Sequence, residues 1–240
     1  MSLLKSLFGA RNSTAARSHN PAFQDAIARW DAIAPADLHA PLATQRWLVV
    51  DVETTGLNMK RDRLLAIGAV QIEGAGIRLQ KSFEVVLKQA APSGAENILI
   101  HRIAGGEQLE GVDAASALLA FLEYAGKLPC VAFHAPFDET MLQRAFDEYL
   151  GVDFSPPFID LAWLAPALCQ EASRKLKSLD DWVEHFSISI SVRHRAVADA
   201  MGTAQLFQVL LQRAAANNID SADSLLKIAE DQRWLSKARR

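Results

Sequence analysis

Four carboxylates and one histidine stand in three short segments, and their residue types could bind metal ions and move a proton. Asp51 and Glu53 lie in WLVVDVETTG, and Asp138 follows in HAPFDETML. His194 and Asp199 complete the set in HRAVAD. Carboxylate oxygens are the ligands of Mg²⁺ and Mn²⁺, whereas zinc is more often bound by His and Cys. The set therefore predicts a site for hard divalent cations, provided that the fold brings the three segments together.

The first pair ends an apolar run, residues 47–52, which predicts a buried strand. Side chains two apart on a strand point to the same face, so Asp51 and Glu53 should lie side by side. Neighbouring carboxylates repel each other and resist ionisation unless a cation stands between them. An isolated DxE is more often a strand-end cap with a solvent-facing glutamate, so the interpretation as metal ligands depends on the other two segments.

The other two acids are ordinary when each is taken alone. PCVAFH predicts a second strand, and the helix expected over residues 136–150 has Asp138 in its first turn, where a carboxylate complements the positive end of a helix. HRAVADAMGTAQLFQVLLQRA predicts an amphipathic helix with Asp199 in its opening turns. His194 by itself could be a surface residue between two arginines. Only the combination of the three segments indicates chemistry.

In this order, the segments DxETTGL, FDxxxL and HxAxxD resemble the DEDDh-type (DnaQ-like) 3'-5' exonuclease superfamily, which includes the epsilon proofreading subunit of bacterial DNA polymerase III, RNase T and oligoribonuclease. The resemblance covers about residues 46–213. LLAIGAVQI, NILIHRIAG, FIDLAWLA and SLDDWVEHFSI match further parts of the family pattern. The chain departs from that pattern at Phe133 and His134, where the family commonly has His-Asn, and over residues 101–104, where His-Gly-Ile-Thr is common.

The resemblance implies two-metal hydrolysis of phosphodiester bonds. It assigns Asp51, Glu53, Asp138 and Asp199 to hold two divalent cations, Mg²⁺ or Mn²⁺, as metal ligands of the catalytic site. It assigns His194 as the general base for the attacking water, and an ordinary imidazole, mostly neutral at working pH, suits that step. All five positions match the family, so we expect an active enzyme.

The resemblance also implies a pocket for the terminal nucleotide. Thr54 and Thr55 would bond the 3' sugar, and Gly56 would let the backbone approach it. Leu57 would wedge between the last two bases, and His101 with its loop would complete the pocket.

His134, at a departure from the family pattern, is a sixth expected substrate contact. The expected substrate is the 3' end of single-stranded DNA, in proofreading or repair, with a DNA polymerase or another replication or repair protein as partner. An exoribonuclease that trims RNA 3' ends and a non-catalytic nucleic-acid-binding module remain as alternatives. The sequence does not indicate an oligomeric state.

Composition limits the remaining classes of function. The chain has 240 residues, half of them apolar, and a formal net charge of -3, so it lacks the basic excess of strong non-specific DNA binders. An enzyme that processes ends needs only local positive charge. Cys130 and Cys169 have neither metal-ligand nor disulfide-framework spacing, which favours a reduced, cytoplasmic protein. No apolar run reaches the length of a membrane span, so we expect no membrane association.

The order of the predicted strands and helices fits a mixed sheet covered by helices. The resemblance implies that this α/β fold is ribonuclease H-like, a mixed five-stranded sheet flanked by helices. We expect residues 1–44 to be a partly helical N-terminal extension, residues 45–213 the exonuclease domain, and residues 214–240 a C-terminal helical tail. Residues 1–19 are basic enough to mimic an organellar presequence, although a bacterial N-terminus is favoured. Residues 88–111, rich in Gly and Pro, should form the longest irregular stretch.

Overall fold

The protein is described here from a computed structural model that covers residues 21–74, 76–172, 175–190 and 194–238. The presequence expectation for residues 1–19 lies outside these described residues. The strands are β1 (Arg46–Thr54), β2 (Leu64–Glu73), β3 (Gly76–Ile77), β4 (Phe83–Val86), β5 (Cys130–Ala132) and β6 (Phe158–Asp160). The helices are α1 (Pro21–Asp31), η1 (Leu79–Lys81), α2 (Ala95–His101), α3 (Gly105–Leu109), α4 (Ala114–Ala125), α5 (Pro136–Leu150), α6 (Leu161–Leu168), α7 (Leu179–His185), α8 (Ala196–Ala216) and α9 (Ala222–Ala238).

The strands form one mixed sheet in the order β3-β2-β1-β5-β6, and β4 also pairs with β2. Strand β1 is antiparallel to β2 and parallel to β5, and β6 is parallel to β5. The expectation of a mixed sheet flanked by helices is confirmed, but within the described residues the sheet has six strands instead of five. The additional strand, β3, has two residues, too few for any alternation to be recognised in the sequence.

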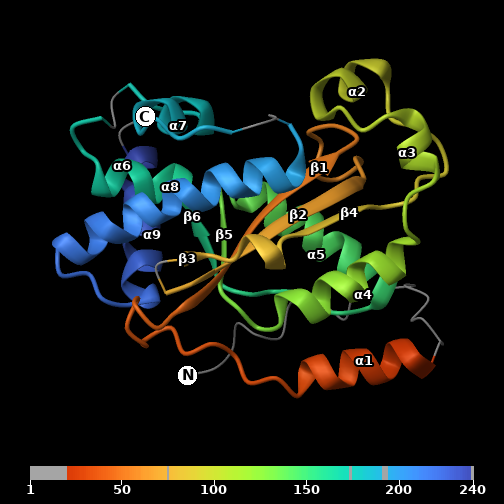
Figure 1. The fold of residues 1–240 in the computed structure, drawn as a ribbon, viewed down its shortest axis with the longest axis horizontal. Coiled ribbons are helices and arrows are strands. Elements are labelled where there is room, and N and C mark those ends of the chain that lie inside the picture. Colours follow the sequence, from red (N-terminus) through yellow and green to blue (C-terminus); the bar gives the residue numbers. More distant parts are fainter. Residues whose placement is uncertain (1–20, 75, 173–174, 191–193, 239–240) are drawn as a thin grey trace.

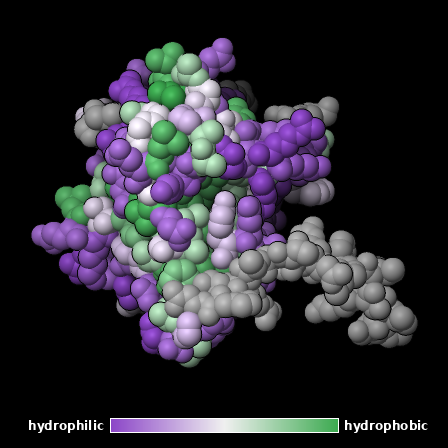
Figure 2. Space-filling model, turned by 90° about the vertical axis from the view of Figure 1, so that its right-hand side faces the viewer, coloured by the Kyte–Doolittle hydropathy of each residue, from purple (hydrophilic) through white to green (hydrophobic). Residues whose placement is uncertain are grey.

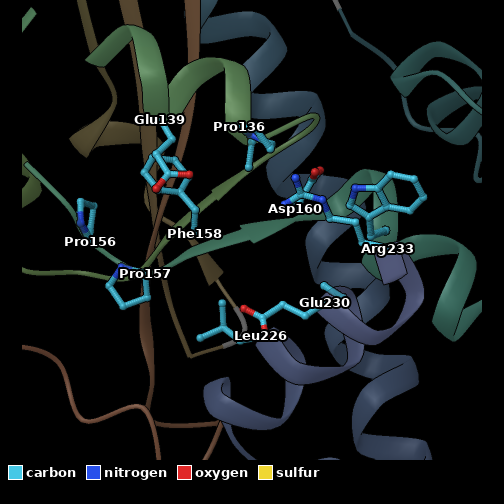
Figure 3. Close-up of a pocket in the computed structure, with 12 residues that line it drawn as sticks. Pro136, Glu139, Pro156, Pro157, Phe158, Asp160, Leu226, Glu230 and Arg233 are labelled. Atoms are coloured by element: carbon cyan, nitrogen blue, oxygen red, sulfur yellow. The ribbon is translucent and has the colours of Figure 1, made fainter. Parts of the chain in front are cut away.

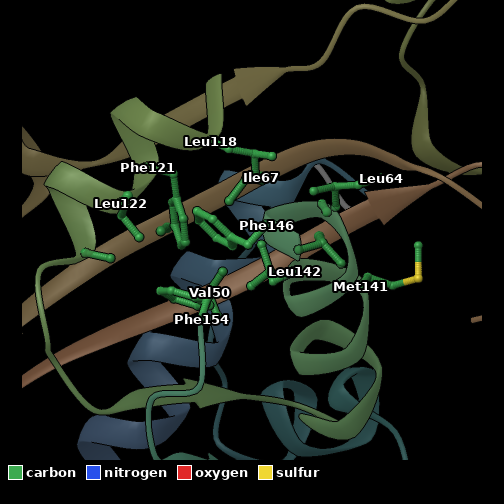
Figure 4. Packing of buried hydrophobic residues seen from close by; sticks show 14 of the residues in the cluster. Val50, Leu64, Ile67, Leu118, Phe121, Leu122, Met141, Leu142, Phe146 and Phe154 are labelled. Atoms are coloured by element: carbon green, nitrogen blue, oxygen red, sulfur yellow. The ribbon is translucent and has the colours of Figure 1, made fainter. Parts of the chain in front are cut away.

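The central strand β1 divides the apolar core into two layers. Leu48 and Val50 face a cluster built mainly from α1, α4 and α5, whereas Trp47 and Val49 face one built from α6 to α9. Figure 1 shows these two groups of helices on either side of the sheet. Figure 4 shows the first layer, in which aromatic and aliphatic side chains of α4 and α5 pack over Val50. The side chains of Asp51 and Glu53 therefore belong to the α8 face.

The N-terminal extension and the C-terminal tail both pack on this body. Trp30 of α1 stacks on Phe154 and donates its indole N–H to the Gly126 carbonyl at 2.6 Å. Helix α9 contributes Leu225 and Ala229 to the second core layer. The division into three segments stays a prediction about modularity, but the outer two contribute core residues.

The segment 88–111, expected to be irregular, contains the short helices α2 and α3, of seven and five residues. Elements this short show too little periodicity to be distinguished from a loop in the sequence. Both helices lie beyond the ends of β1 and β2 (Figure 1). Leu99 and Ile100 of α2 are exposed. Apolar side chains gather near the top of Figure 2, at the height where Figure 1 places α2.

Among the described residues, no helix combines the length and apolarity that crossing a bilayer requires.

Candidate active site

Three of the expected metal ligands converge at the end of β1. Asp51, Glu53 and Asp199 each place a carboxylate oxygen within 4.8 Å of the other two. Asp51 and Glu53 are half-buried and Asp199 is buried, so bulk water screens their mutual repulsion only partly. The donor set consists of oxygens alone, which fits Mg²⁺ or Mn²⁺ and disfavours zinc. The arrangement thus suits a hard divalent cation.

Gly68 lets α8 approach β1 closely enough for this convergence. In the sheet register Gly68 is the partner of Asp51, and a Cβ atom built on it would lie 2.0 Å from the carbonyl carbon of Ala196. Contacts below 3.0 Å essentially never occur for real Cβ atoms, so any side chain here would displace the start of α8. Asp199 lies in the first turn of that helix. Sequence reasoning missed Gly68, and only its position in an apolar strand could have drawn attention to it.

Asp138 is buried next to the three converging acids but does not belong to their group. It lies in the first turn of α5 and accepts a hydrogen bond from the Val52 amide at 3.1 Å. Burial raises the pKa of Asp138 to about 8, and the negative charges of Asp160 and Glu53 act in the same direction. A cation near this carboxylate would favour its ionised form. Asp138 is thus placed beside the site, while its role as a ligand stays a prediction.

His194 adjoins the acids through its backbone. Its amide donates to Asp199 Oδ2 at 3.0 Å, and its side chain is exposed to solvent. The residue has a φ of 62°, in the left-handed region that few non-glycine residues adopt. This conformation turns the chain immediately before α8 and keeps His194 at the edge of the acidic cluster. The position is compatible with the expected general base, and that role stays a prediction.

The turn after β1 is held by its own hydroxyl groups. Thr54 Oγ1 donates to the Gly56 carbonyl at 2.7 Å, and Thr55 Oγ1 donates to Asp62 Oδ1 at 3.0 Å. A Cβ atom on Gly56 would lie 2.6 Å from Asp62 Oδ2, so a side chain here would displace the carboxylate that binds Thr55 and Asn58. Leu57 is 86% exposed, so its side chain is free to contact a ligand. Each threonine oxygen can still accept another hydrogen bond, so their expected sugar contacts remain compatible with this geometry.

Two residues that sequence reasoning missed secure this turn. Asp62 also accepts from the Asn58 amide at 2.7 Å, and Arg144 of α5 donates to the carbonyls of Met59 and Asp62. The spacing of Asn58 and Asp62 is a signal of a side-chain-stabilised turn that the sequence did contain. No such local signal marks Arg144, because the two carbonyl groups to which it donates lie more than 80 residues away.

The two other histidines expected to contact substrate are placed differently from each other. His101 is only 2% exposed, its Nδ1 accepts from the Ile103 amide at 3.0 Å, and its Nε2 lies 3.1 Å from Ser93 Oγ. Burial lowers the pKa of His101, which favours its neutral form. His134 is exposed with a φ of 64°, and its amide donates to Asp160 Oδ1 at 2.9 Å. Of His101 and His134, only His134 is exposed to solvent.

A cavity of about 320 Å³ lies at the β6 edge of the sheet, between α5, β6 and α9. Figure 3 shows Glu139 of α5 on one side and Leu226, Glu230 and Arg233 of α9 on the other. None of the three converging acids lines it. The cavity is therefore separate from the acidic cluster.

Comparison with known proteins gives two kinds of sequence similarity. A protein-family model described as "Exonuclease" matches residues 48–207. DNA polymerase III PolC-type of Bacillus subtilis is 31% identical over 188 residues, which is 78% of this chain and 13% of that protein. The protein of that name from Thermotoga maritima is 32% identical over 162 residues, 67% of this chain and 11% of that protein. The chain thus spans about an eighth of the length of these curated relatives.

Solved structures share the fold. Escherichia coli Exonuclease I in complex with a dT13 oligonucleotide has a TM-score of 0.60 and 17% identity, over 72% of this chain and 42% of that one. Exonuclease X in complex with 5' overhanging duplex DNA has a TM-score of 0.60 and 18% identity, over 76% of this chain and 99% of that one. At these identities the likeness concerns the architecture alone, and it confirms the expected fold class.

Proposed function

The chain belongs to the exonuclease family, and from this premise we propose that it hydrolyses nucleotides from the 3' end of single-stranded DNA. The observation that carries the proposal is the convergence of Asp51, Glu53 and Asp199 within 4.8 Å at the end of β1. These residues belong to two of the three motifs on which the family resemblance rests. The remaining motif, FDxxxL, supplies Asp138, which is buried beside them.

The residues at the end of β1 would divide the work as follows. Asp51, Glu53, Asp138 and Asp199 would hold two divalent cations, Mg²⁺ or Mn²⁺. When bound, such cations supply the positive charge that stabilises the attacking and leaving oxygens of the phosphodiester. His194 would take the proton from the attacking water. The turn from Thr54 to Leu57, together with His101 and His134, would orient the terminal nucleotide.

DNA is favoured as substrate by the similarity to two PolC-type polymerases and by the DNA named in the complexes of Exonuclease I and Exonuclease X. The same similarity supports a role in replication or repair, with a DNA polymerase or another replication protein as partner. We also propose that the protein acts in the cytoplasm, with Cys130 and Cys169 reduced; both are free and buried.

The test is digestion of a 5'-labelled single strand by the purified full-length protein in Mg²⁺ or Mn²⁺. We expect a descending ladder of shortened products and release of mononucleotides, with RNA of the same sequence degraded more slowly. EDTA and the Asp51→Ala variant should each abolish most turnover, because loss of a ligand removes charge stabilisation from the displacement.

Circular single-stranded DNA separates this function from an endonuclease of the same chemistry. Positioning can contribute about 7 to 11 kcal/mol of a barrier, so a strand without a 3' end should survive far longer than a linear one. Rapid nicking of the circle would remove the proposed roles of Thr54, Thr55 and Leu57. Undiminished hydrolysis by Asp51→Ala would show that the acidic cluster is not the active site.

A further inference from the structure

Residues 93–108 form a brace that is tied together by buried polar side chains. Gln108, which is fully buried, donates from Nε2 to the Ile103 carbonyl at 2.9 Å and to Ser93 Oγ at 3.1 Å. Its Oε1 accepts from the Ser93 amide at 2.8 Å. His101 adds the bonds to Ser93 and Ile103 described above. Buried polar groups that are satisfied in this way hold a segment in one conformation.

This brace also contacts the turn from Thr54 to Leu57, which is called the substrate turn below. Asn97, in the first turn of α2, donates from its side-chain amide to the Thr55 carbonyl. The Thr55 amide is already bonded to the Arg63 carbonyl at 2.9 Å, so both main-chain groups of Thr55 are fixed, the second by a residue 42 positions away. Arg63 also reaches the Ala91 carbonyl, but at 3.5 Å and on the exposed surface, where a hydrogen bond is weak.

We propose that Asn97 is a positioning residue, which holds the Thr54–Leu57 turn in the geometry that receives a 3'-hydroxyl terminus. The inference rests on the proposed function. It also gives the buried His101 a task in this chain: His101 supports α2 from within the brace, and α2 reaches the substrate turn through Asn97. Since the turn would contact substrate before and during the reaction alike, loss of the bond should weaken binding more than turnover.

The test removes the amide donor without adding charge. Asn97→Leu keeps the approximate shape of the side chain, and Asn97→Ala gives the same comparison without added apolar surface. The matched control is Asn217→Leu, because Asn217 makes the same type of bond, from Nδ2 to the Arg213 carbonyl at 2.8 Å, at the far end of α8.

Binding is measured with a 5'-fluorescein single-stranded oligonucleotide, and hydrolysis of the same oligonucleotide is measured separately in Mg²⁺. Both Asn97 variants should bind the 3'-hydroxyl oligonucleotide about tenfold more weakly, with kcat changed less than about threefold. Their preference for the 3'-hydroxyl over a 3'-phosphate oligonucleotide should shrink by a similar factor. Asn217→Leu should match the unaltered protein in all three quantities.

Unchanged affinity and unchanged end preference in the Asn97 variants would overturn the proposal, as would an equal effect from Asn217→Leu. A fall in kcat with affinity retained would also overturn it, because it would place Asn97 in the chemical step. The proposed function fails on a different reading: a protein that binds the oligonucleotide but never shortens it contradicts hydrolysis, and the affinities still decide the role of Asn97.

Discussion

His194 contacts the site through its backbone, and the proposed function gives its side chain a second, separate task. The backbone amide holds Asp199 Oδ2, while the exposed imidazole remains available for proton transfer. His194 adopts a left-handed backbone conformation in this arrangement, and asparagine tolerates the same conformation well. The two contributions can therefore be separated by substitution.

We expect His194→Asn to lower kcat by roughly 10² to 10⁴ while metal and oligonucleotide affinity stay within a factor of about two or three. The replacement keeps the backbone bond to Asp199 but loses the base. Steady-state hydrolysis and metal titration on the same preparation provide the measurement. His39→Asn, at an exposed site, is the control. A variant that no longer binds metal would instead make His194 a ligand or a folding residue.

Sequence predicts residues at this scale only where a short motif contains the chemistry. Asp51 and Glu53 are two positions apart on an apolar run, so their proximity followed from strand geometry alone. Asp199 could be joined to them through the family resemblance. Asp160 lies in FIDLAWLA, but that segment did not indicate that its carboxylate accepts from the His134 amide, because the two residues lie 26 positions apart.

At the scale of elements, the site depends on how closely α8 crosses β2. The absence of a side chain at Gly68 allows the Ala196 backbone to pass, and α8 then delivers Asp199 to β1. Helix boundaries and strand periodicity were predictable here, as α5 and its bounds of 136–150 show. The close crossing was not, because it depends on two backbones that meet far apart in the sequence.

Gly68→Ala should therefore damage the site without altering any ligand. We expect a loss of about 1 to 3 kcal/mol in the free energy of unfolding, as for other overpacked cores, together with weaker metal binding. Gly76→Ala is the control, because the nearest atom to its added Cβ, the Glu73 carbonyl oxygen, lies 3.8 Å away. Denaturant unfolding and metal titration of both variants measure the effect. Equal metal affinity in the two variants would contradict this account of the crossing.

The brace of residues 93–108 should be sensitive to pH through His101. Burial lowers the pKa of this histidine, so the unfolded segment binds a proton more readily than the folded one. The contribution of neutral His101 to the stability of the brace is complete above the ordinary histidine pKa, near 6.5. It is lost as pH falls from there toward the lowered pKa of His101. Protonation would also remove the acceptor at Nδ1 that binds the Ile103 amide.

Hydrogen exchange at the Ile103 amide, corrected for the intrinsic rate, should report this loss. Protection should fall between pH 7 and pH 5 in the unaltered protein. In His101→Asn the side-chain oxygen can replace Nδ1 as the acceptor but does not titrate, so protection should depend much less on pH. The same pH dependence in both proteins would assign the effect to another group.

At the scale of the whole molecule, the segment that leads into β1 is hydrogen-bonded to the start of α9. The Leu42 amide donates to the Asp220 carbonyl at 2.8 Å, and the Asp223 amide donates to the Leu38 carbonyl at 3.0 Å. The sequence predicted helical structure in both terminal segments. It could not show that the approach to β1 meets the start of α9, because contacts between positions about 180 apart leave no local pattern.

Trp30 links the extension to the core through a buried side chain. It is 6% exposed, stacks on Phe154, and its indole N–H reaches the Gly126 carbonyl. A protein that begins near Ala43 would keep every expected catalytic residue and should still hydrolyse short single strands. It would also expose the part of the first core layer that Trp30 covers, so we expect this truncation to retain activity but lose solubility.

Substitution of tryptophan at two positions tests this contribution without shortening the chain. Trp30→Ala should lower the free energy of unfolding by about 3 to 5 kcal/mol, the range for a buried large aromatic side chain, because it leaves a cavity and removes the stacking on Phe154. Trp234→Ala, at a position that is 68% exposed on α9, should change it by no more than about 0.5 kcal/mol. Denaturant unfolding of both variants gives the comparison, and hydrolysis at low temperature shows whether the folded Trp30 variant keeps its specific activity. Because the indole packs on Phe154 and bonds to Gly126, activity per folded molecule should be unchanged; a stable but inactive Trp30→Ala protein would show that α1 contributes to the site as well as to the core.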